Sequence, residues 1–315
     1  MSDNQFKMLP IIFSCAGTTL SEGERQLFTR CQPAGFILFQ RNCETPTQTK
    51  QLTDALRECV NQDDIPILID QEGGRVVRLQ PPHWWVAPSA ASYLQQTDDL
   101  SEAARLAKID AKRTADQLQA IGINVNCAPV LDCPILGADP VIGGRAYSSS
   151  PQEIITIAQA VIEGFQAGGV IPVIKHIPGH GRALVDSHKA LPVVDTPAPD
   201  LCEYDFLPFQ ALAKSAPWAM TAHVIYTAYD TERCATISPK VIQEVIREYI
   251  GFEGVLVSDD LSMKALSGDL IAKVKDTLAA GCDLALYCDG DLAEMEILAD
   301  NIAPTTPIPF PMKTS

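Results

Sequence analysis

The chain has 315 residues, 46% of them hydrophobic, with a formal charge of −15 and a pI of about 4.7. This composition supplies a sizeable core and differs from that of disordered chains. The acidic balance argues against nucleic acid and anionic membrane surfaces as main partners, because both require basic patches. A small anionic ligand remains possible, because local Arg and Lys side chains can hold one.

Ten cysteines occur without a CxxC pair or zinc-ligand spacing, which predicts free thiols and no metal site. Free thiols are typical of the reducing cytoplasm. The N-terminal residues MSDNQFKMLP lack the pattern of a signal peptide, and no apolar run reaches about 18 residues. We therefore expect a cytoplasmic protein that does not span a membrane. Nucleotide and flavin signatures are also missing from the sequence, so we expect no cofactor.

Short, nearly continuous apolar runs alternate with amphipathic stretches along the chain. Such runs are typical of parallel strands buried on both faces. The eight expected strands are Leu9–Cys15, Gly35–Phe39, Ile65–Asp70, Ile123–Val130, Ile171–His176, Trp218–Val224, Val255–Asp259 and Leu284–Cys288. The pattern predicts a single catalytic (β/α)8 TIM-type barrel over residues 1–303, with a doubly wound open sheet as the alternative. Residues 304–315 form a proline-rich tail that we expect to be extended.

Helices are expected between most of these strands. Two cover Thr47–Asn61 and Leu100–Ile121, and two more begin at Ser150-Pro151 and at Ser238-Pro239. Ser150 and Glu153 have the spacing of a capping box, and proline stands at the first helical position.

Polar residues gather where the expected strands end. In a barrel of this kind, catalytic residues lie at the carboxyl ends of the strands. The residues found there are Asp70, Gln71, Glu72, Asp132, Lys175, His176, His223, Asp259 and Asp260. Their placement on successive strands predicts an active site at this end of the barrel.

Two groups of residues can carry proton transfer and nucleophilic attack. Asp259 ends a strand and can act as a nucleophile or an electrostatic stabiliser, while Asp260 can cap the next helix. Asp186 and His188 point the same way in an extended backbone, so the carboxylate can orient the imidazole as a general acid/base. Alternatively, Asp186 bonds its own backbone in a turn. The loop 178–187 contains two glycines and could move. An acid/base beside an anion is what glycosyl transfer requires.

The same segments resemble those of glycoside hydrolase family 3. The resemblance rests on IKHIPGHG (174–181), DSH (186–188), LPVV (191–194), IDQEGGR (69–75), GRAYS (144–148) and VSDDLSM (257–263). It runs from about Ile11 to Tyr287, nearly the whole chain. The most similar branch is that of the cytoplasmic bacterial β-N-acetylglucosaminidases that recycle peptidoglycan.

The resemblance implies a role for each matching residue. Asp259 matches the nucleophile, His188 the acid/base and Asp186 the partner of that histidine. The positions that hold the terminal N-acetylglucosamine are matched by Asp70, Arg78, Arg145, Lys175 and His176, and a further pocket position is matched by His223. The implied enzyme is a retaining exo-β-N-acetylglucosaminidase that acts on peptidoglycan fragments such as GlcNAc-anhydroMurNAc, with or without peptide. We expect it to be a monomer.

Four other activities remain open. A family 3 β-glucosidase or an N-acetylglucosaminide phosphorylase would use the same residues. A Schiff-base aldolase would use Lys175 as its nucleophile. A sugar-binding barrel without catalysis would be expected to lack Asp259 or the Asp186/His188 pair, and the sequence contains all three residues.

Overall fold

The computed structural model describes residues 7–187, 190–263, 265–266 and 268–308. Eight parallel strands close into a barrel in the order β1-β10-β9-β7-β5-β4-β3-β2. The strands are β1 (Leu9–Phe13), β2 (Pro33–Leu38), β3 (Ile67–Ile69), β4 (Val125–Asn126), β5 (Ile171–Ile177), β7 (Trp218–Thr221), β9 (Val255–Asp260) and β10 (Leu284–Tyr287). The predicted (β/α)8 barrel is thus confirmed. The open-sheet alternative is wrong, because β1 pairs with both β2 and β10.

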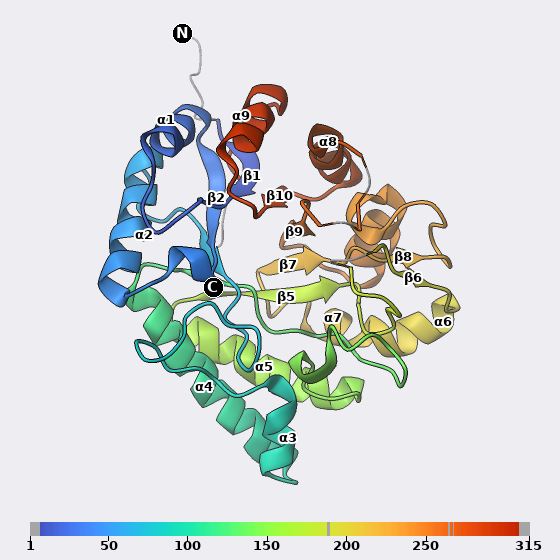
Figure 1. The fold of residues 1–315 in the computed structure, drawn as a ribbon. Helices are drawn as coiled ribbons and strands as arrows, with labels where there is room; N and C mark the ends of the chain where they lie inside the picture. Colours follow the sequence, from blue (N-terminus) through green and yellow to red (C-terminus); the bar gives the residue numbers. More distant parts are fainter. Residues whose placement is uncertain (1–6, 188–189, 264, 267, 309–315) are drawn as a thin grey trace.

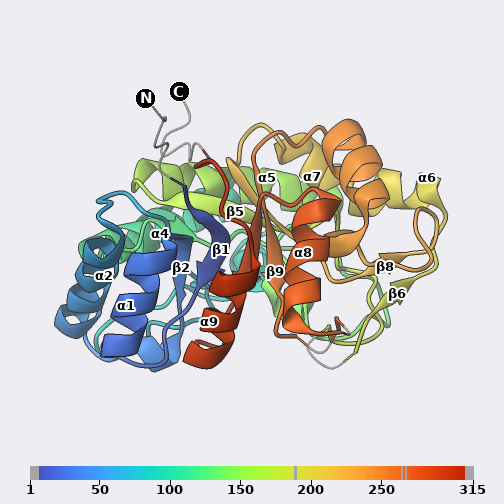
Figure 2. The same cartoon turned by 90° about the horizontal axis from the view of Figure 1, so that it is seen from above.

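Helices surround these strands, as the two perpendicular views show (Figures 1 and 2). They are α1 (Glu22–Cys31), α2 (Pro46–Val60), α3 (Tyr93–Gln96), α4 (Leu100–Ala120), α5 (Pro151–Ala167), α6 (Ala198–Asp200), α7 (Leu207–Leu212), α8 (Leu270–Ala280) and α9 (Leu292–Asn301). Two further segments are wound as π-helices, η4 (Leu201–Asp205) and η6 (Val241–Tyr249). Short 3-10 turns are η1 (Gln40–Asn42), η2 (Ala90–Ser92), η3 (Gly143–Arg145) and η5 (Ala235–Ile237).

The four expected helices are present, but the expected capping box at α5 is wrong. Ser150 makes no side-chain cap, and the Glu153 carboxylate instead accepts a hydrogen bond from the Ser148 hydroxyl. A true capping box opens α1, where Ser21 and Glu24 bond each other's backbone N–H groups. The Ser148 hydroxyl takes both partners of the expected box, because it donates to Glu153 and accepts from the Ser150 backbone N–H at 3.0 Å.

β3 and β4 are shorter than expected because side-chain amides replace part of the strand pairing. The Asn124 side chain accepts from the Ile67 N–H at 2.7 Å. The Asn126 side chain accepts from the Gln71 N–H and donates to the Gln71 carbonyl, both at 3.0 Å. These bonds satisfy the backbone where the regular ladder stops. They also fix the chain just before the polar residues of the β3–α3 loop.

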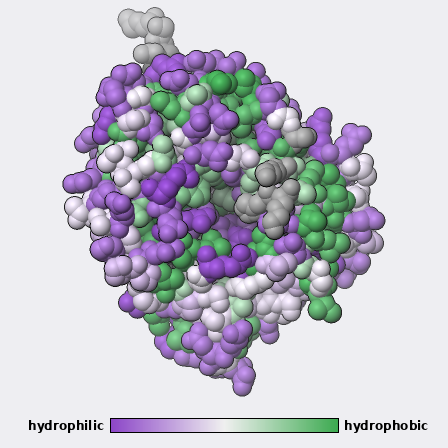
Figure 3. Space-filling model, viewed as in Figure 1, coloured by the Kyte–Doolittle hydropathy of each residue, from purple (hydrophilic) through white to green (hydrophobic). Residues whose placement is uncertain are grey.

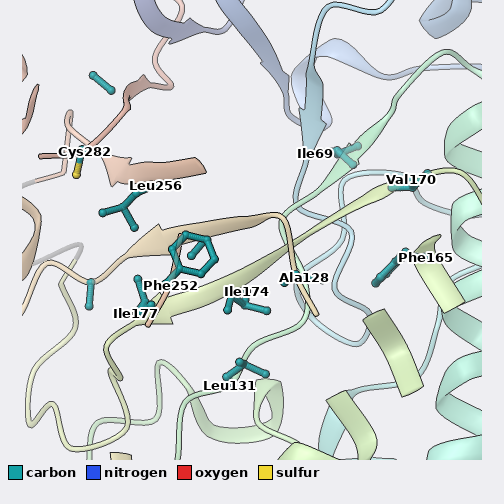
Figure 4. Packing of buried hydrophobic residues seen from close by; sticks show 14 of the residues in the cluster. Ile69, Ala128, Leu131, Phe165, Val170, Ile174, Ile177, Phe252, Leu256 and Cys282 are labelled. Atoms are coloured by element: carbon teal, nitrogen blue, oxygen red, sulfur yellow. The ribbon is translucent and has the colours of Figure 1, made fainter. Parts of the chain in front are cut away.

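The strands are apolar throughout because they separate two layers of core. Side chains inside the barrel form one cluster, which includes Ile12, Leu68 and Val257. Alternate side chains on the same strands face the helices and form a larger cluster, part of which is drawn in Figure 4 with Ile69, Ile174 and Leu256. A barrel filled in this way leaves room for a ligand only beyond the strand ends.

A two-stranded parallel pair lies apart from the barrel, formed by β6 (Val193–Val194) and β8 (Ile225–Tyr226). Strand pairing between β6 and β8 thus connects the segment after the β5 loop with the segment after β7. At the other end of the chain, Thr305 exchanges two backbone hydrogen bonds with Met8, at 2.8 and 3.0 Å. The first residues of the expected tail thus lie against the start of β1, and the domain limit at residue 303 stays a prediction.

Candidate active site

A cavity of about 400 Å³ lies at the carboxyl ends of the barrel strands. Figure 3 shows a hollow near the centre of one face of the molecule, bordered by hydrophilic side chains. The lining is rich in charged and imidazole groups: Asp70, Glu72, Arg75, Arg78, Arg145, Lys175, His176, His180, Asp186, Asp259 and Asp260. Seven of the nine residues with a predicted catalytic or binding role line this cavity. His223 does not line it, and His188 lies outside the described residues.

One wall of the cavity is a chain of alternating charges that links β3 to β5. Lys175 lies two residues before the end of β5, and its Nζ lies 2.8 Å from Asp70 Oδ1 and 2.6 Å from Glu72 Oε1. The Glu72 carboxylate also accepts two hydrogen bonds at 2.8 Å from the Arg145 guanidinium. Asp70 accepts a second bond, at 3.0 Å, from Arg78. Each buried charge thus has an opposite partner, which offsets the cost of removing it from water.

These contacts keep the wall ionised. Burial favours the neutral form of Asp70, but Lys175 and Arg78 outweigh it and hold the pKa of Asp70 well below its usual range. Burial likewise opposes ionisation of Glu72, whose pKa is lowered by Lys175 and Arg145. The pKa of Lys175 is raised despite its burial, because two carboxylates contact it. The wall therefore presents fixed donors and acceptors of the kind that sugar hydroxyl and amide groups bind.

A second buried carboxylate organises the histidines. Asp132 is fully buried after β4, and its oxygens lie 2.7 Å from His176 Nδ1, 3.1 Å from the His176 backbone N and 2.7 Å from the His180 backbone N. Because Asp132 engages Nδ1, the His176 ring turns its Nε2 toward Arg145, at 3.5 Å. Burial and the neighbouring His176 lower the pKa of His180 to about 4, so that ring is neutral near pH 7.

Asp259 lies at the end of β9 and lines the same cavity. Burial alone would raise the pKa of Asp259, but the nearby His223, His176 and Lys175 lower it below its usual range. Asp259 is therefore an anion at neutral pH. The adjacent Asp260 accepts hydrogen bonds from the Ser262 backbone and hydroxyl, while α8 is capped by Asp269. The idea that Asp260 caps the next helix is thus wrong.

His223 lies behind the cavity and does not line it. The ring is fully buried, with Nδ1 2.7 Å from Thr236 Oγ1 and Nε2 2.9 Å from the Asp260 carbonyl. Because a carbonyl can only accept, Nε2 carries the hydrogen. Burial lowers the pKa of His223. In this position His223 supports the backbone beside Asp259.

The loop after β5 reaches over the cavity. Asp186 and Ser187 line it, and Ser187 Oγ lies 3.3 Å from His180 Nε2. His188 lies outside the described residues, so its pairing with Asp186 stays a prediction. The start of the loop is held by the β4 loop, since the Gly181 carbonyl accepts from the Ile135 N–H at 3.2 Å.

Three residues of the site were not singled out for a role from the sequence: Glu72 and His180, which line the cavity, and Asp132, which is buried behind the histidines. Glu72 and Asp132 stand at the expected strand ends, and His180 lies in the KHIPGHG segment, so position alone could have pointed to them. Among the described residues, no group of three or more His, Cys, Asp or Glu side chains could hold a metal ion.

Comparison with known proteins agrees with this geometry. The model of the glycosyl hydrolase family 3 N-terminal domain matches residues 5–306. Beta-hexosaminidases from Psychromonas ingrahamii and Pseudomonas aeruginosa PAO1 are 36% and 35% identical over 299 and 300 residues. Each alignment covers 94% of this chain and 87% or 88% of the relative.

Two solved structures are similar over most of this chain. NagZ from Neisseria gonorrhoeae, in complex with N-trifluoroacetyl-D-glucosamine, has a TM-score of 0.87 and 31% identity. The match covers 96% of this chain and 87% of that one. The family 3 β-N-acetylglucosaminidase from Paenibacillus sp. str. FPU-7 has a TM-score of 0.85 and 32% identity, over 93% of this chain and 56% of that longer chain.

Proposed function

This chain belongs to glycosyl hydrolase family 3 and is a β-N-acetylhexosaminidase, and we propose that it releases terminal N-acetylglucosamine from peptidoglycan fragments with retention of configuration. The observation that carries the proposal is the position of Asp259. It is an ionised carboxylate at a barrel strand end, in a cavity that is also lined by a wall of paired charges. The names of the related proteins support the choice of N-acetylglucosamine as the sugar.

In the proposed reaction, Asp259 attacks the anomeric carbon and forms a covalent glycosyl-enzyme. His188 gives a proton to the leaving oxygen and later takes one from the water that releases the sugar. Asp186 orients His188 through the loop that lines the cavity. The lowered pKa of Asp259 supports its role, because a nucleophile must stay ionised while the acid is protonated.

The sugar is proposed to lie against the charged wall. Asp70 and Arg78 offer an acceptor and donors for hydroxyl groups, while Arg145, Lys175 and His176 offer donors for hydroxyl and amide oxygens. A cavity of about 400 Å³ falls within the range of about 300–1,000 Å³ usual for small-ligand sites. Because most donors of the wall are already fixed by carboxylates, little ordering is required when the sugar binds.

Peptidoglycan fragments as substrate, a cytoplasmic location and a monomeric state complete the proposal. All ten cysteines are free thiols, which supports a reducing compartment. Across the described ranges, no helix is both long and apolar enough to cross a bilayer.

The first test compares hydrolysis of 4-nitrophenyl N-acetyl-β-glucosaminide with that of the plain β-glucoside. We expect a strong preference for the N-acetyl sugar, and the β-anomer of N-acetylglucosamine as the first product seen by NMR. A preference for the glucoside would instead indicate a β-glucosidase. A sugar 1-phosphate formed only when phosphate is added would indicate a phosphorylase.

The covalent step is tested with an activated 2-fluoro glycoside and mass spectrometry of the digested protein. The label should lie on the peptide that contains Asp259, and the Asp259→Ala variant should carry none. A label that persists on another residue would refute the assignment of the nucleophile.

A further inference from the structure

One cation of the cavity lacks the carboxylate partner that the other three have. Lys175 contacts Asp70 and Glu72, Arg145 contacts Glu72, and Arg78 contacts Asp70. The fourth cation, which also lines the cavity, is Arg75. Its Nη2 donates to the carbonyls of Pro140, at 3.1 Å, and Val141. Within the described residues, no carboxylate pairs with it.

The backbone presents Arg75 in a fixed position. Gly73 and Gly74 adopt φ values of +105° and +57°, and an antiparallel bridge joins Gly73 to Val76. The turn also packs closely on the segment beyond it. A Cβ on Gly73 would lie 2.5 Å from the Pro88 carbonyl oxygen. Only glycine accepts both the positive φ and this approach, so the turn holds its backbone while the side chain of Arg75 stays exposed.

The Arg75 guanidinium lies beside the charged wall, next to Arg145. Arg145 Nη1 lies 3.4 Å from the same Val141 carbonyl that Arg75 contacts, so the two guanidinium groups are neighbours. The charge of Arg145 is offset by Glu72, and the charge of Arg75 is not. Both of these Arg75 bonds use Nη2, which leaves Nε–H and the Nη1–H groups for a ligand. Because the chain has a net charge of −15, it repels anions in general. The local positive charge of Arg75 counters this repulsion at the mouth of the cavity.

We propose that Arg75 binds a carboxylate on the leaving part of the substrate. This inference rests on the proposed function and deepens it, because the part that leaves must project from the enclosed sugar pocket toward the mouth. A guanidinium with free Nε–H and Nη1–H groups is suited to bind a carboxylate oxygen through charge-assisted hydrogen bonds. Arg75 thereby selects an acidic leaving group over a neutral one of the same shape.

The test uses two disaccharides with the same glycosidic bond. One joins N-acetylglucosamine to 1,6-anhydro-N-acetylmuramic acid, and the other carries the methylamide of that acid. The wild type should hydrolyse the acid with a kcat/KM about fivefold higher, near the upper end for an exposed ion pair. Salt at about 1 M should remove most of this preference, because the Debye length falls to about 3 Å. Arg75→Gln should lower kcat/KM for the acid about fivefold and leave the amide within twofold.

Arg113→Gln is the matched control. It removes the same charge from an exposed arginine that stacks on Trp85 and does not line the cavity, so it should keep the wild-type preference. Equal rates for acid and amide in the wild type would overturn the inference, as would an equal loss on both in Arg75→Gln. Phosphate that speeds turnover only when Arg75 is present would assign this cation to an inorganic anion instead, and would also overturn it.

Hydrolysis of 4-nitrophenyl N-acetyl-β-glucosaminide is measured in parallel. If the wild type hydrolyses this substrate and neither disaccharide, peptidoglycan fragments are not the substrate, and the inference fails together with that part of the proposed function. If the wild type hydrolyses both disaccharides equally, the proposed function stands and the inference about Arg75 alone is wrong.

Discussion

A substitution of Glu72 tests whether stability and substrate binding depend on the charged wall. Its side chain is only 6% exposed; it forms an ion pair with Lys175 at 2.6 Å and accepts two hydrogen bonds from Arg145 at 2.8 Å. The Glu72→Gln variant keeps the shape but removes the charge that offsets both cations. Removing one partner of a buried ion pair lowers the free energy of unfolding by about 3–5 kcal/mol. Because glutamine keeps one oxygen that can accept a hydrogen bond, we expect a loss of about 3 kcal/mol for this variant.

The same change should weaken sugar binding. Without Glu72, Lys175 and Arg145 must be ordered by the substrate, at about 0.5–1.5 kcal/mol for each side chain. Together these costs amount to about 1–3 kcal/mol, or roughly a 5- to 150-fold rise in KM. The value of kcat should change less, because no contact joins Glu72 to Asp259 among the described residues.

Urea denaturation and steady-state kinetics on 4-nitrophenyl N-acetyl-β-glucosaminide measure the two effects. Glu102→Gln is the matched control, because Glu102 also holds an arginine through two hydrogen bonds at 2.7 Å, but on the exposed surface of α4. We expect the control to behave as the wild type. If the two variants have the same stability and the same KM, the wall does not depend on Glu72 and the reasoning fails.

Two further predictions concern the histidines. His188→Ala should slow release of a poorly activated alkyl leaving group by about 10²–10⁴ but barely slow release of 4-nitrophenol; steady-state rates that fall equally for both would contradict its role as the acid. The pKa of His180 is about 4 in the folded protein and 6.5 in the unfolded chain. The unfolded chain therefore binds the proton first, and stability should fall by about 3 kcal/mol as the pH drops from 6.5 to 4. In urea denaturation at several pH values, His180→Asn should flatten this slope; a slope equal to that of the wild type would show that another group causes it.

The barrel could be predicted from the sequence because its strands have a simple pattern. Runs such as Ile171–Ile174 and Val255–Val257 are buried on both faces, so they remain apolar until the strand ends. The charged residues that follow each run therefore mark the mouth of the barrel. This rule found Lys175 and Asp259 without any knowledge of the fold.

The pairings within the site could not be predicted in the same way. The Lys175–Glu72 contact joins residues 103 positions apart, as the numbering shows, and it depends on the turn at Gly73 and Gly74. The shortened β3 and β4 depend on side-chain bonds from Asn124 and Asn126, which compete with regular pairing and leave no periodic signal. His223 was placed in the pocket by resemblance, but the structure turns its ring toward Thr236 and a backbone carbonyl.

The distribution of charge in the cavity links the stability of the fold to its chemistry. A buried carboxylate next to Asp259 would raise the pKa of Asp259 if that carboxylate were unpaired. Asp70 and Glu72 avoid this because Lys175 lies between them and contacts both. The same ammonium lowers the pKa of Asp259. In the proposed function, the wall thus carries two acids that bind the sugar while Asp259 stays ionised for attack. Removing the Lys175 ammonium itself should therefore disturb substrate binding and the ionisation of Asp259 together.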